Sequence, residues 1–203
     1  LKEAHETEKP WYLYVAFNAP HAPLQALKED YKKYEGRYKG GWDAIYQARL
    51  KKQKMLGLFG HEIKPPERPD HVRAWDKLDD DWKTFEEMRM TAIAAMIDRI
   101  DQEMGRLVAD LKRAGELENT LILFLSDNGA CPYDRKRNQR NLDQKLWDPA
   151  VKWSDSTGWA WARNAPFRFY KQNQFEGGIC TPAIVHWPAG LKTRPGSVVD
   201  SPA

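Results

Sequence analysis

Short runs of apolar residues predict strands at three places along the chain. The clearest run, at 121–125, has five consecutive apolar residues and passes directly into Ser-Asp-Asn-Gly at 126–129. An apolar run this short, closed by a turn sequence, is typical of a strand that is covered on both faces in a parallel sheet. Residues 11–17 are rich in aromatic and β-branched side chains, which favour strands, and residues 182–187 resemble a further strand.

Between positions 93 and 111 apolar residues recur every three or four places, which predicts a helix with one apolar face. The members of this face are Ile93, Ile97, Ile100, Met104, Leu107 and Leu111. The regular pattern begins near Trp82, and Gly115 is placed to end the helix. A strand, a long connection with a helix, and a second strand form a right-handed crossover. We therefore predict that residues 11–17 and 121–125 lie in one parallel sheet, on which the helix packs.

The segment 27–81 shows no regular period and contains prolines at 65, 66 and 69. We interpret it as an insertion of short helices and loops over the edge of the sheet, where substrate-selecting elements are often found. The predicted fold class is α/β, with a mostly parallel sheet covered by helices on both faces. The chain opens without Met on a charged segment, so we interpret 1–203 as part of a longer protein, truncated at both ends.

Composition excludes some classes of protein. With 32 basic and 29 acidic residues the net charge is +3, which does not indicate a nucleic-acid partner. The one local excess of basic residues, at 135–140, is interpreted as a solvated loop. No run of eighteen apolar residues exists, so no membrane span is predicted in this segment. The cysteines, Cys131 and Cys180, cannot form a disulfide framework.

Asp127 and Asn128 are the candidate metal ligands. Open parallel sheets place their sites at the carboxyl ends of strands, where these two residues stand. Their side chains offer hard oxygen donors, which suit calcium or magnesium better than zinc. The alternative interpretation is an ordinary turn, because Asn-Gly is one of the commonest turn dipeptides.

His21 follows the predicted strand at 11–17 and lies between Pro20 and Pro23. The prolines end the strand and stiffen the loop that carries the imidazole, at the sheet edge predicted for Asp127. A histidine in a loop can be incidental, but a stiffened histidine at this edge is also a candidate for proton transfer.

Arg168 and Lys171 form a pair of cations shortly before the glycine pair at 177–178. Glycines let the backbone approach closely, and fixed cations suit a tetrahedral oxyanion. A basic surface loop explains the same residues equally well. Four tryptophans, at 147, 153, 159 and 161, either stack on sugar or aryl rings or anchor a long loop by burial.

Together, three segments resemble successive motifs of the sulfatase family, which has an alkaline-phosphatase-like fold. They are Asn-Ala-Pro-His-Ala-Pro at 18–23, Ser-Asp-Asn-Gly at 126–129, and Pro-Phe-Arg at 166–168 with Lys171 ahead of Glu-Gly-Gly at 176–178. The resemblance implies that 1–203 is part of the catalytic domain of a type I, arylsulfatase-like enzyme. In such an enzyme a formylglycine made from Cys or Ser attacks a sulfate ester beside a calcium ion.

Residue by residue, the resemblance implies calcium ligands at Asp127 and Asn128, and sulfate-contacting residues at His21 and Lys171, with Arg168 as a further cation. His21 would also protonate the leaving group. The expected substrate is a sulfated small molecule or carbohydrate, and the implied compartment is periplasmic, extracellular or lysosomal. Fixed cations aimed at the charge that develops on oxygen would lower the barrier.

The nucleophile motif of the family, Cys or Ser with Pro two places on and Arg at the fifth place, is absent. Cys180 has Pro182 but Ile184 in place of the arginine, and Cys131 is followed by a proline one place too early. A reactive nucleophile needs a cationic, correctly oriented neighbour, so we reject both cysteines. This chain by itself is therefore expected to be inactive.

Two other functions stay open at this stage. A metal-dependent phosphoesterase or phosphonate hydrolase of the same superfold would share the carboxylate and the cations. A non-catalytic binding module for sulfated glycans would keep Lys171 and the tryptophans, but it would not need the metal.

Overall fold

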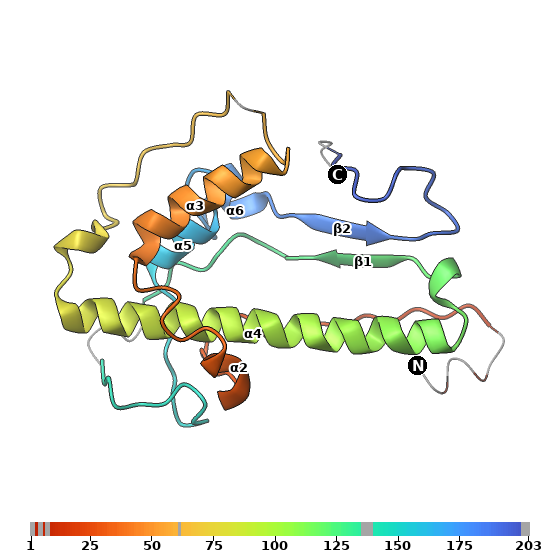
Figure 1. The fold of residues 1–203 in the computed structure, drawn as a ribbon, viewed down its shortest axis with the longest axis horizontal. Coiled ribbons are helices and arrows are strands. Elements are labelled where there is room, and N and C mark those ends of the chain that lie inside the picture. Colours follow the sequence, from red (N-terminus) through yellow and green to blue (C-terminus); the bar gives the residue numbers. More distant parts are fainter. Residues whose placement is uncertain (1–2, 4–5, 7–8, 61, 135–139, 200–203) are drawn as a thin grey trace.

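The computed structural model describes residues 3, 6, 9–60, 62–134 and 140–199. The basic run at 135–137 therefore lies outside the described residues, whereas the guanidinium of Arg140 stacks 4.6 Å from the centre of the Trp82 ring. Helices dominate the structure, and the sheet is small (Figure 1). The elements are α2 (Lys28–Lys32), α3 (Gly41–Met55), η1 (Trp75–Lys77), α4 (Asp80–Arg113), η2 (Leu117–Asn119), β1 (Ile122–Leu125), α5 (Thr157–Arg163), α6 (Glu176–Ile179) and β2 (Ala183–His186).

The long helix α4 confirms the periodic apolar pattern, although it begins slightly earlier than predicted. The carboxylate of Asp79 accepts a hydrogen bond of 2.8 Å from the amide of Trp82 and so caps the first turn. Gly115 follows the last turn with φ +73°, the left-handed conformation that glycine adopts without strain. Ile93 is fully buried, but Ile97 on the same predicted face is 46% exposed.

The predicted parallel pairing of residues 11–17 with 121–125 is wrong for the described structure. Residues 11–17 form no strand, and β1 pairs with β2 in an antiparallel register that sets Ile122 opposite His186. Both 11–17 and β1 lead away from the C-terminal end of α4 (Figure 1), and the indole of Trp11 donates to Glu116 over 3.1 Å. The side chains of 11–17 favour an extended backbone, but a strand also needs a neighbouring strand for its backbone hydrogen bonds, and the described structure provides none here.

The expectation that residues 121–125 are covered on both faces is also wrong for the described structure. Leu123 is 58% exposed in β1, and Ile184 is 63% exposed in β2. Among the described residues, α4 packs with α2, α3 and η2, so its buried middle faces helices and loops where a sheet had been predicted. The strand at 182–187 is confirmed as β2, with a turn at Ala189 and Gly190 after it.

An aromatic core fills the space between α3, η1 and α5. The rings of Trp42 and Trp75 lie 4.9 Å apart edge to face, and those of Tyr46 and Trp161 stack at 4.1 Å. Trp153 and Trp159 are also buried. Burial is therefore confirmed for Trp153, Trp159 and Trp161, which anchor the fold, whereas Trp147 is half-buried. The insertion at 27–81 contains a helix of 15 residues, longer than the short helices predicted.

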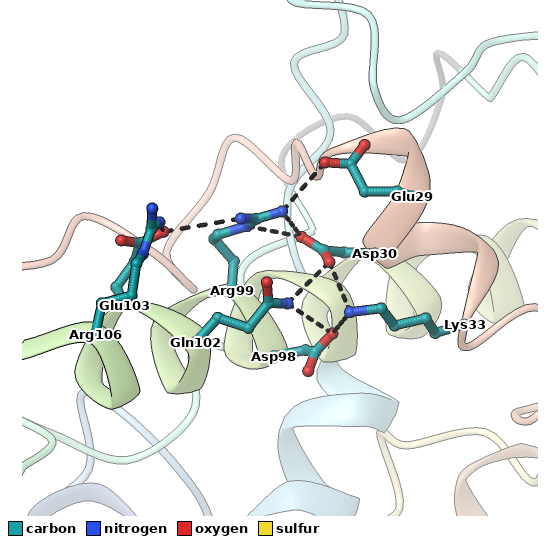
Figure 2. Close-up of polar contacts among 8 residues, drawn as sticks. All are labelled: Glu29, Asp30, Lys33, Asp98, Arg99, Gln102, Glu103 and Arg106. Carbon is teal, nitrogen blue, oxygen red and sulfur yellow. Dashed lines mark hydrogen bonds and ion pairs between the residues drawn. The ribbon is translucent and has the colours of Figure 1, made fainter. Parts of the chain in front are cut away.

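A cluster of charged side chains joins α2 to α4 (Figure 2). Asp30, which is 1% exposed, accepts hydrogen bonds from the Lys33 ammonium at 2.9 Å, the Arg99 guanidinium at 2.8 Å and the Gln102 amide at 3.0 Å. Burial by itself raises the pKa of Asp30, but these donors outweigh it and hold the pKa below its ordinary value. The cluster fixes the short helix α2 on the middle of α4.

None of the described helices is both long enough and apolar enough to cross a membrane.

Candidate active site

Asn164, the C-cap of α5, joins the loop at Ala130 to Phe169 and to Gly177 of α6 (Glu176–Ile179). Its Nδ2 donates to the carbonyl of Gly177 at 2.5 Å and to that of Phe169 at 3.1 Å. Its Oδ1 accepts from the amide of Ala130 at 3.0 Å. One side chain therefore holds the loop at 126–130, which we name the Asp127 loop, against the loop at 167–173, which we name the Lys171 loop.

Backbone hydrogen bonds reinforce the same junction. The amide of Lys171 donates to the carbonyl of Ala130 at 3.1 Å, and the amide of Gly129 donates to the carbonyl of Gly178 at 3.1 Å. The structure thus brings together two of the three predicted motifs, the oxygen donors at 127–128 and the cations at 168 and 171. Backbone bonds set this arrangement, so it does not depend on the conformations of long side chains.

The backbone is packed so closely at this junction that three positions, 129, 177 and 178, have no room for a side chain. A Cβ on Gly129 would lie 1.8 Å from the carbonyl oxygen of Gly177, and a Cβ on Gly177 would lie 2.0 Å from that of Phe169. Gly178 faces the carbonyl of Asn173 at a similar distance, 2.0 Å. Any side chain at these positions would push the two loops apart. The close backbone approach predicted for the glycine pair is therefore confirmed.

Asp127 and Asn128 fit the oxygen-donor half of a metal site. Asp127 is exposed and has no ion pair among the described residues, while Oδ1 of Asn128 is buried and has no hydrogen-bond partner there. A buried acceptor without a donor is unfavourable, and a hard cation is one group that would satisfy it. Within the described part of the chain, no group of three or more His, Cys, Asp or Glu is arranged to hold a metal. These two residues would therefore supply part of a ligand set.

Lys171 and Arg168 have no carboxylate partner among the described residues. Lys171 is half-buried, and Arg168 is exposed, with its guanidinium 4.4 Å from the centre of the Phe175 ring and 4.9 Å from that of Phe169. Stacking on two rings restricts the arginine without neutralising its charge. The Lys171 loop therefore presents positive charge beside the Asp127 loop, an arrangement that suits an anionic ligand.

His21 lies in a turn after residues 11–17, where its amide donates to the carbonyl of Asn18 at 3.0 Å. The imidazole is exposed, and its Nδ1 lies 2.8 Å from the carbonyl of Ala22. The described contacts do not join His21 to the Asp127 loop or to the Lys171 loop. Its assignment to the site therefore stays a prediction.

The sequence reasoning missed two parts of this site. Asn164 directly precedes the Ala-Pro-Phe-Arg stretch, and a polar residue next to such a loop is a signal that could have been followed. A buried ion cluster on α4 was also missed. Arg89, fully buried, contacts Glu86 at 3.2 Å and Asp134 at 2.6 Å. It ties the stretch after the Asp127 loop to α4.

One further contact holds the same stretch: the hydroxyl of Thr157 donates to the carbonyl of Pro132 at 3.0 Å. Nearby in the sequence, buried Asp155 pairs with Arg163 on α5. Burial, only partly opposed by the charge of Arg89, raises the pKa of Glu86 to about 7. Cys131 is half-buried and Cys180 exposed, and they form no disulfide in the described structure. Neither is proposed as a nucleophile.

On a mixed fold of helices and a small sheet, the loop that carries Arg168 and Lys171 packs against the Asp127 loop, and the described residues offer no carboxylate to either cation. The chain belongs to the sulfatase family: the family model described as Sulfatase matches residues 1–202.

Curated relatives agree with this assignment. An uncharacterized sulfatase of Schizosaccharomyces pombe is 36% identical over 203 residues, which cover 92% of this chain and 36% of that protein. An arylsulfatase of Klebsiella aerogenes is 31% identical over 97% of this chain and 44% of its own length. A solved structure, described as Ps i-CgsB in complex with k-i-k-neocarrahexaose, aligns with a TM-score of 0.48 and 24% identity over 92% of this chain and 25% of that one. The chain thus spans less than half the length of these relatives.

Proposed function

We propose that this chain forms part of an enzyme that hydrolyses sulfate esters, and that Lys171 and Arg168 bind the sulfate group. The observation that supports the proposal is the junction at Asn164, which holds the loop carrying the two cations against the Asp127 loop; neither cation has a carboxylate partner among the described residues. Membership of the sulfatase family, with relatives named arylsulfatase and N-acetylgalactosamine-6-sulfatase, supports the same reaction. We also propose that the complete catalytic domain has the alkaline-phosphatase-like superfold.

The cations act on the charge of the reacting group. Sulfate transfer moves negative charge onto the non-bridging and leaving oxygens, and fixed donors aimed at them stabilise the transition state. Stacking between two aromatic rings limits the conformations of Arg168, and the backbone bond from Lys171 to Ala130 fixes the start of the lysine side chain. Both groups are therefore partly organised before the substrate arrives.

Asp127 and Asn128 would hold a calcium ion, with other ligands from outside the described residues. When bound, this ion would supply positive charge next to the sulfate and polarise its oxygens. The unsatisfied Oδ1 of Asn128 supports the assignment. We further propose that the nucleophile is a formylglycine that this chain does not provide, since neither cysteine matches the motif.

His21 is proposed to donate a proton to the oxygen of the departing alcohol. Imidazole is the side chain best suited to proton transfer near neutral pH. Its exposure leaves the ring free to meet a substrate. The turn formed with Asn18 keeps it close to the end of residues 11–17.

Of the alternatives, the glycan-binding module loses one of its supports, because Trp153, Trp159 and Trp161 are all buried. They are not free to stack on a sugar. The phosphoesterase shares the cations and the oxygen donors, so it is distinguished by the substrate rather than by these residues. The test below therefore includes a phosphate ester.

The experiment uses the complete protein, after mass spectrometry has established its formylglycine content. Turnover of 4-nitrophenyl sulfate and 4-nitrophenyl phosphate is measured for wild type, Lys171→Ala and Lys192→Ala, the last an exposed lysine after β2. We expect hydrolysis of the sulfate, and a loss of roughly a hundredfold in kcat/KM for Lys171→Ala, about 3 kcal/mol. Lys192→Ala should match wild type. Faster hydrolysis of the phosphate, or wild-type kinetics for Lys171→Ala, would overturn the proposal.

A further inference from the structure

A pocket of about 520 Å³ opens between the Lys171 loop and the stretch at 66–71 from the insertion. Arg168 and Phe169 line one side, and Glu67, Asp70 and His71 line the other. Arg168 is also one of the two cations proposed to bind the sulfate. The pocket therefore adjoins the sulfate position through a shared residue, and its volume lies in the range usual for small-molecule sites, about 300–1,000 Å³.

The Lys171-loop side of the pocket is held in one conformation. Phe169 has φ +60°, in the left-handed region that non-glycine residues rarely adopt, and its carbonyl accepts from Asn164. The imidazole of His71 lies nearly parallel to the Phe169 ring, with centres 6.3 Å apart, and its Nε2 contacts the hydroxyl of Tyr170. These contacts tie the two sides of the pocket together and fix the aromatic surface that a ligand would meet.

The opposite side is also anchored. Arg68 pairs with Asp43 of α3 at 2.5 Å, and the second carboxylate oxygen of Asp43 accepts from the amide of Trp75 at 2.9 Å. Val72 is buried, and its amide donates to the carbonyl of Pro69 at 2.8 Å. The stretch at 66–71 is thus a loop fastened to the helical core, and the groups on its surface are presented in a defined direction.

The polar groups around the pocket decide what it would accept. Glu67 and Asp70 are exposed carboxylates with no ion pair or hydrogen bond to their side chains among the described residues. They offer acceptors, while Arg168 offers donors. A plain aryl or alkyl group would leave these acceptors unused, and a second anionic group would meet two like charges. Hydroxyl groups on a ring satisfy both kinds of partner, and the ring itself can lie against Phe169.

We propose that this pocket binds the alcohol part of the sulfate ester, and that this alcohol is a neutral, hydroxylated ring such as a monosulfated sugar. Glu67 and Asp70 determine specificity by accepting hydrogen bonds from the ring hydroxyls. The inference rests on the proposed function, since it concerns the part of the same substrate that is not the sulfate. It assigns a substrate-selecting role to a short stretch of the insertion.

The test compares three substrates in the complete protein: galactose 6-sulfate, a disulfated galactose, and 4-nitrophenyl sulfate. Glu67→Gln and Asp70→Asn are the variants, and Glu118→Gln, an exposed glutamate on η2 far along the chain from the pocket, is the matched control. A double variant carries both Glu67→Gln and Asp70→Asn. In it we expect the kcat/KM for galactose 6-sulfate, divided by the kcat/KM for 4-nitrophenyl sulfate, to fall roughly tenfold. The disulfated sugar, disfavoured in wild type, should gain relative to the monosulfated one.

The outcomes separate the two proposals. If wild type hydrolyses the sulfates but the ratios for the double variant equal those for wild type and for Glu118→Gln, the pocket inference is overturned and the proposed function stands. If wild type hydrolyses none of the sulfates, both proposals are overturned. Thermal unfolding of each variant serves as the check on folding, which exposed and unpaired side chains should not disturb.

Discussion

The cluster around Asp30 and the Lys171 loop both carry charged side chains, but among the described residues only those of the Asp30 cluster are neutralised by partners of opposite charge. Around Asp30, each charge meets an opposite one, and the carboxylate has three donors (Figure 2). In the Lys171 loop, the described residues offer no carboxylate to Lys171 or Arg168. The ion pairs around Asp30 hold α2 on α4, while the cations of the Lys171 loop are available to bind a ligand. An unneutralised cation on a loop that packs against the Asp127 loop, where the Asn128 oxygen is also unsatisfied, is the better indicator of a ligand site.

A third set of charges shows that pairing alone does not set the direction of a pKa shift. Glu86 contacts Arg89, yet its pKa is raised to about 7, whereas the pKa of Asp30 is lowered. Both carboxylates are buried, but Asp30 has three donors and one oxygen of Glu86 has none in the described structure. Burial prevails at Glu86, where the carboxylates of Asp134 and Asp155 add repulsion, whereas the donors prevail at Asp30.

Among the charges that stabilise the fold, we expect the largest effect on stability for Arg89→Met. Removing the guanidinium leaves Glu86 and Asp134 without their shared cation in a buried setting, at a cost of about 3–5 kcal/mol in the free energy of unfolding. Arg113→Met is the control, because this exposed arginine at the end of α4 forms a surface ion pair with Asp110 on its own helix. Denaturant unfolding of the complete protein measures both. Equal losses in the two variants would contradict a structural role for the Arg89 cluster.

Asp127→Ala tests the ligand side. The mutation should weaken calcium binding by at least a hundredfold, about 3 kcal/mol, since even indirect partners of a metal are worth ten- to a hundredfold. Stability without metal should not fall, because the carboxylate has no ion pair among the described residues. Asp143→Ala, at another exposed aspartate in a loop, is the control. Calorimetric titration with calcium is the measurement, and an affinity equal to wild type would remove Asp127 from the site.

The variant His21→Ala tests whether the exposed histidine acts on the substrate. If His21 protonates the leaving oxygen, turnover of alkyl or sugar sulfates should fall roughly a hundredfold. Aryl sulfates with good leaving groups should lose much less, since their oxygen departs as an anion. Steady-state kinetics on both kinds of ester give the answer. The same loss on both would leave His21 with no role as an acid.

The opposite pKa shifts predict opposite slopes of stability against pH. A carboxyl whose pKa is raised on folding holds its proton more tightly when folded, so its contribution is full below the unfolded value, 4.5 for Glu86, and is lost as the pH rises to about 7. Glu86→Gln should remove this loss, which is on the order of 3 kcal/mol. Unfolding at several pH values between 4.5 and 7 measures it. An unchanged slope would show that Glu86 does not titrate in this window.

Asp30→Asn is expected to have the smallest effect of the set, about 2 kcal/mol of stability, because the amide keeps the shape but loses charge-assisted hydrogen bonds. Since the pKa of Asp30 is lowered on folding, its contribution is full above the unfolded value of 3.8 and is lost as the pH falls through the folded one. The variant and wild type should therefore converge in acid. Asp101→Asn, at an exposed position on α4, should match wild type throughout when unfolding is measured at several pH values.

The sequence by itself determined the features that depend on near neighbours. The spacing of apolar residues predicted α4, and Gly115 predicted its end, because helix periodicity and caps are local. The strand at 182–187 was legible for the same reason. The motifs at 126–129 and 166–178 identified the family, and the glycine pair predicted a close backbone approach, since only the absence of a Cβ permits it.

Only the tertiary structure decided what pairs with what. The junction at Asn164 links it to Ala130, 34 positions away, and Arg89 reaches Asp134 across 45 positions. The antiparallel pairing of β1 with β2 joins residues about 60 positions apart, and the burial of Trp159 and Trp161 depends on how α3, α5 and η1 come together. Such contacts leave no periodic signal in the sequence, because any residue that the chain brings within reach can supply the partner.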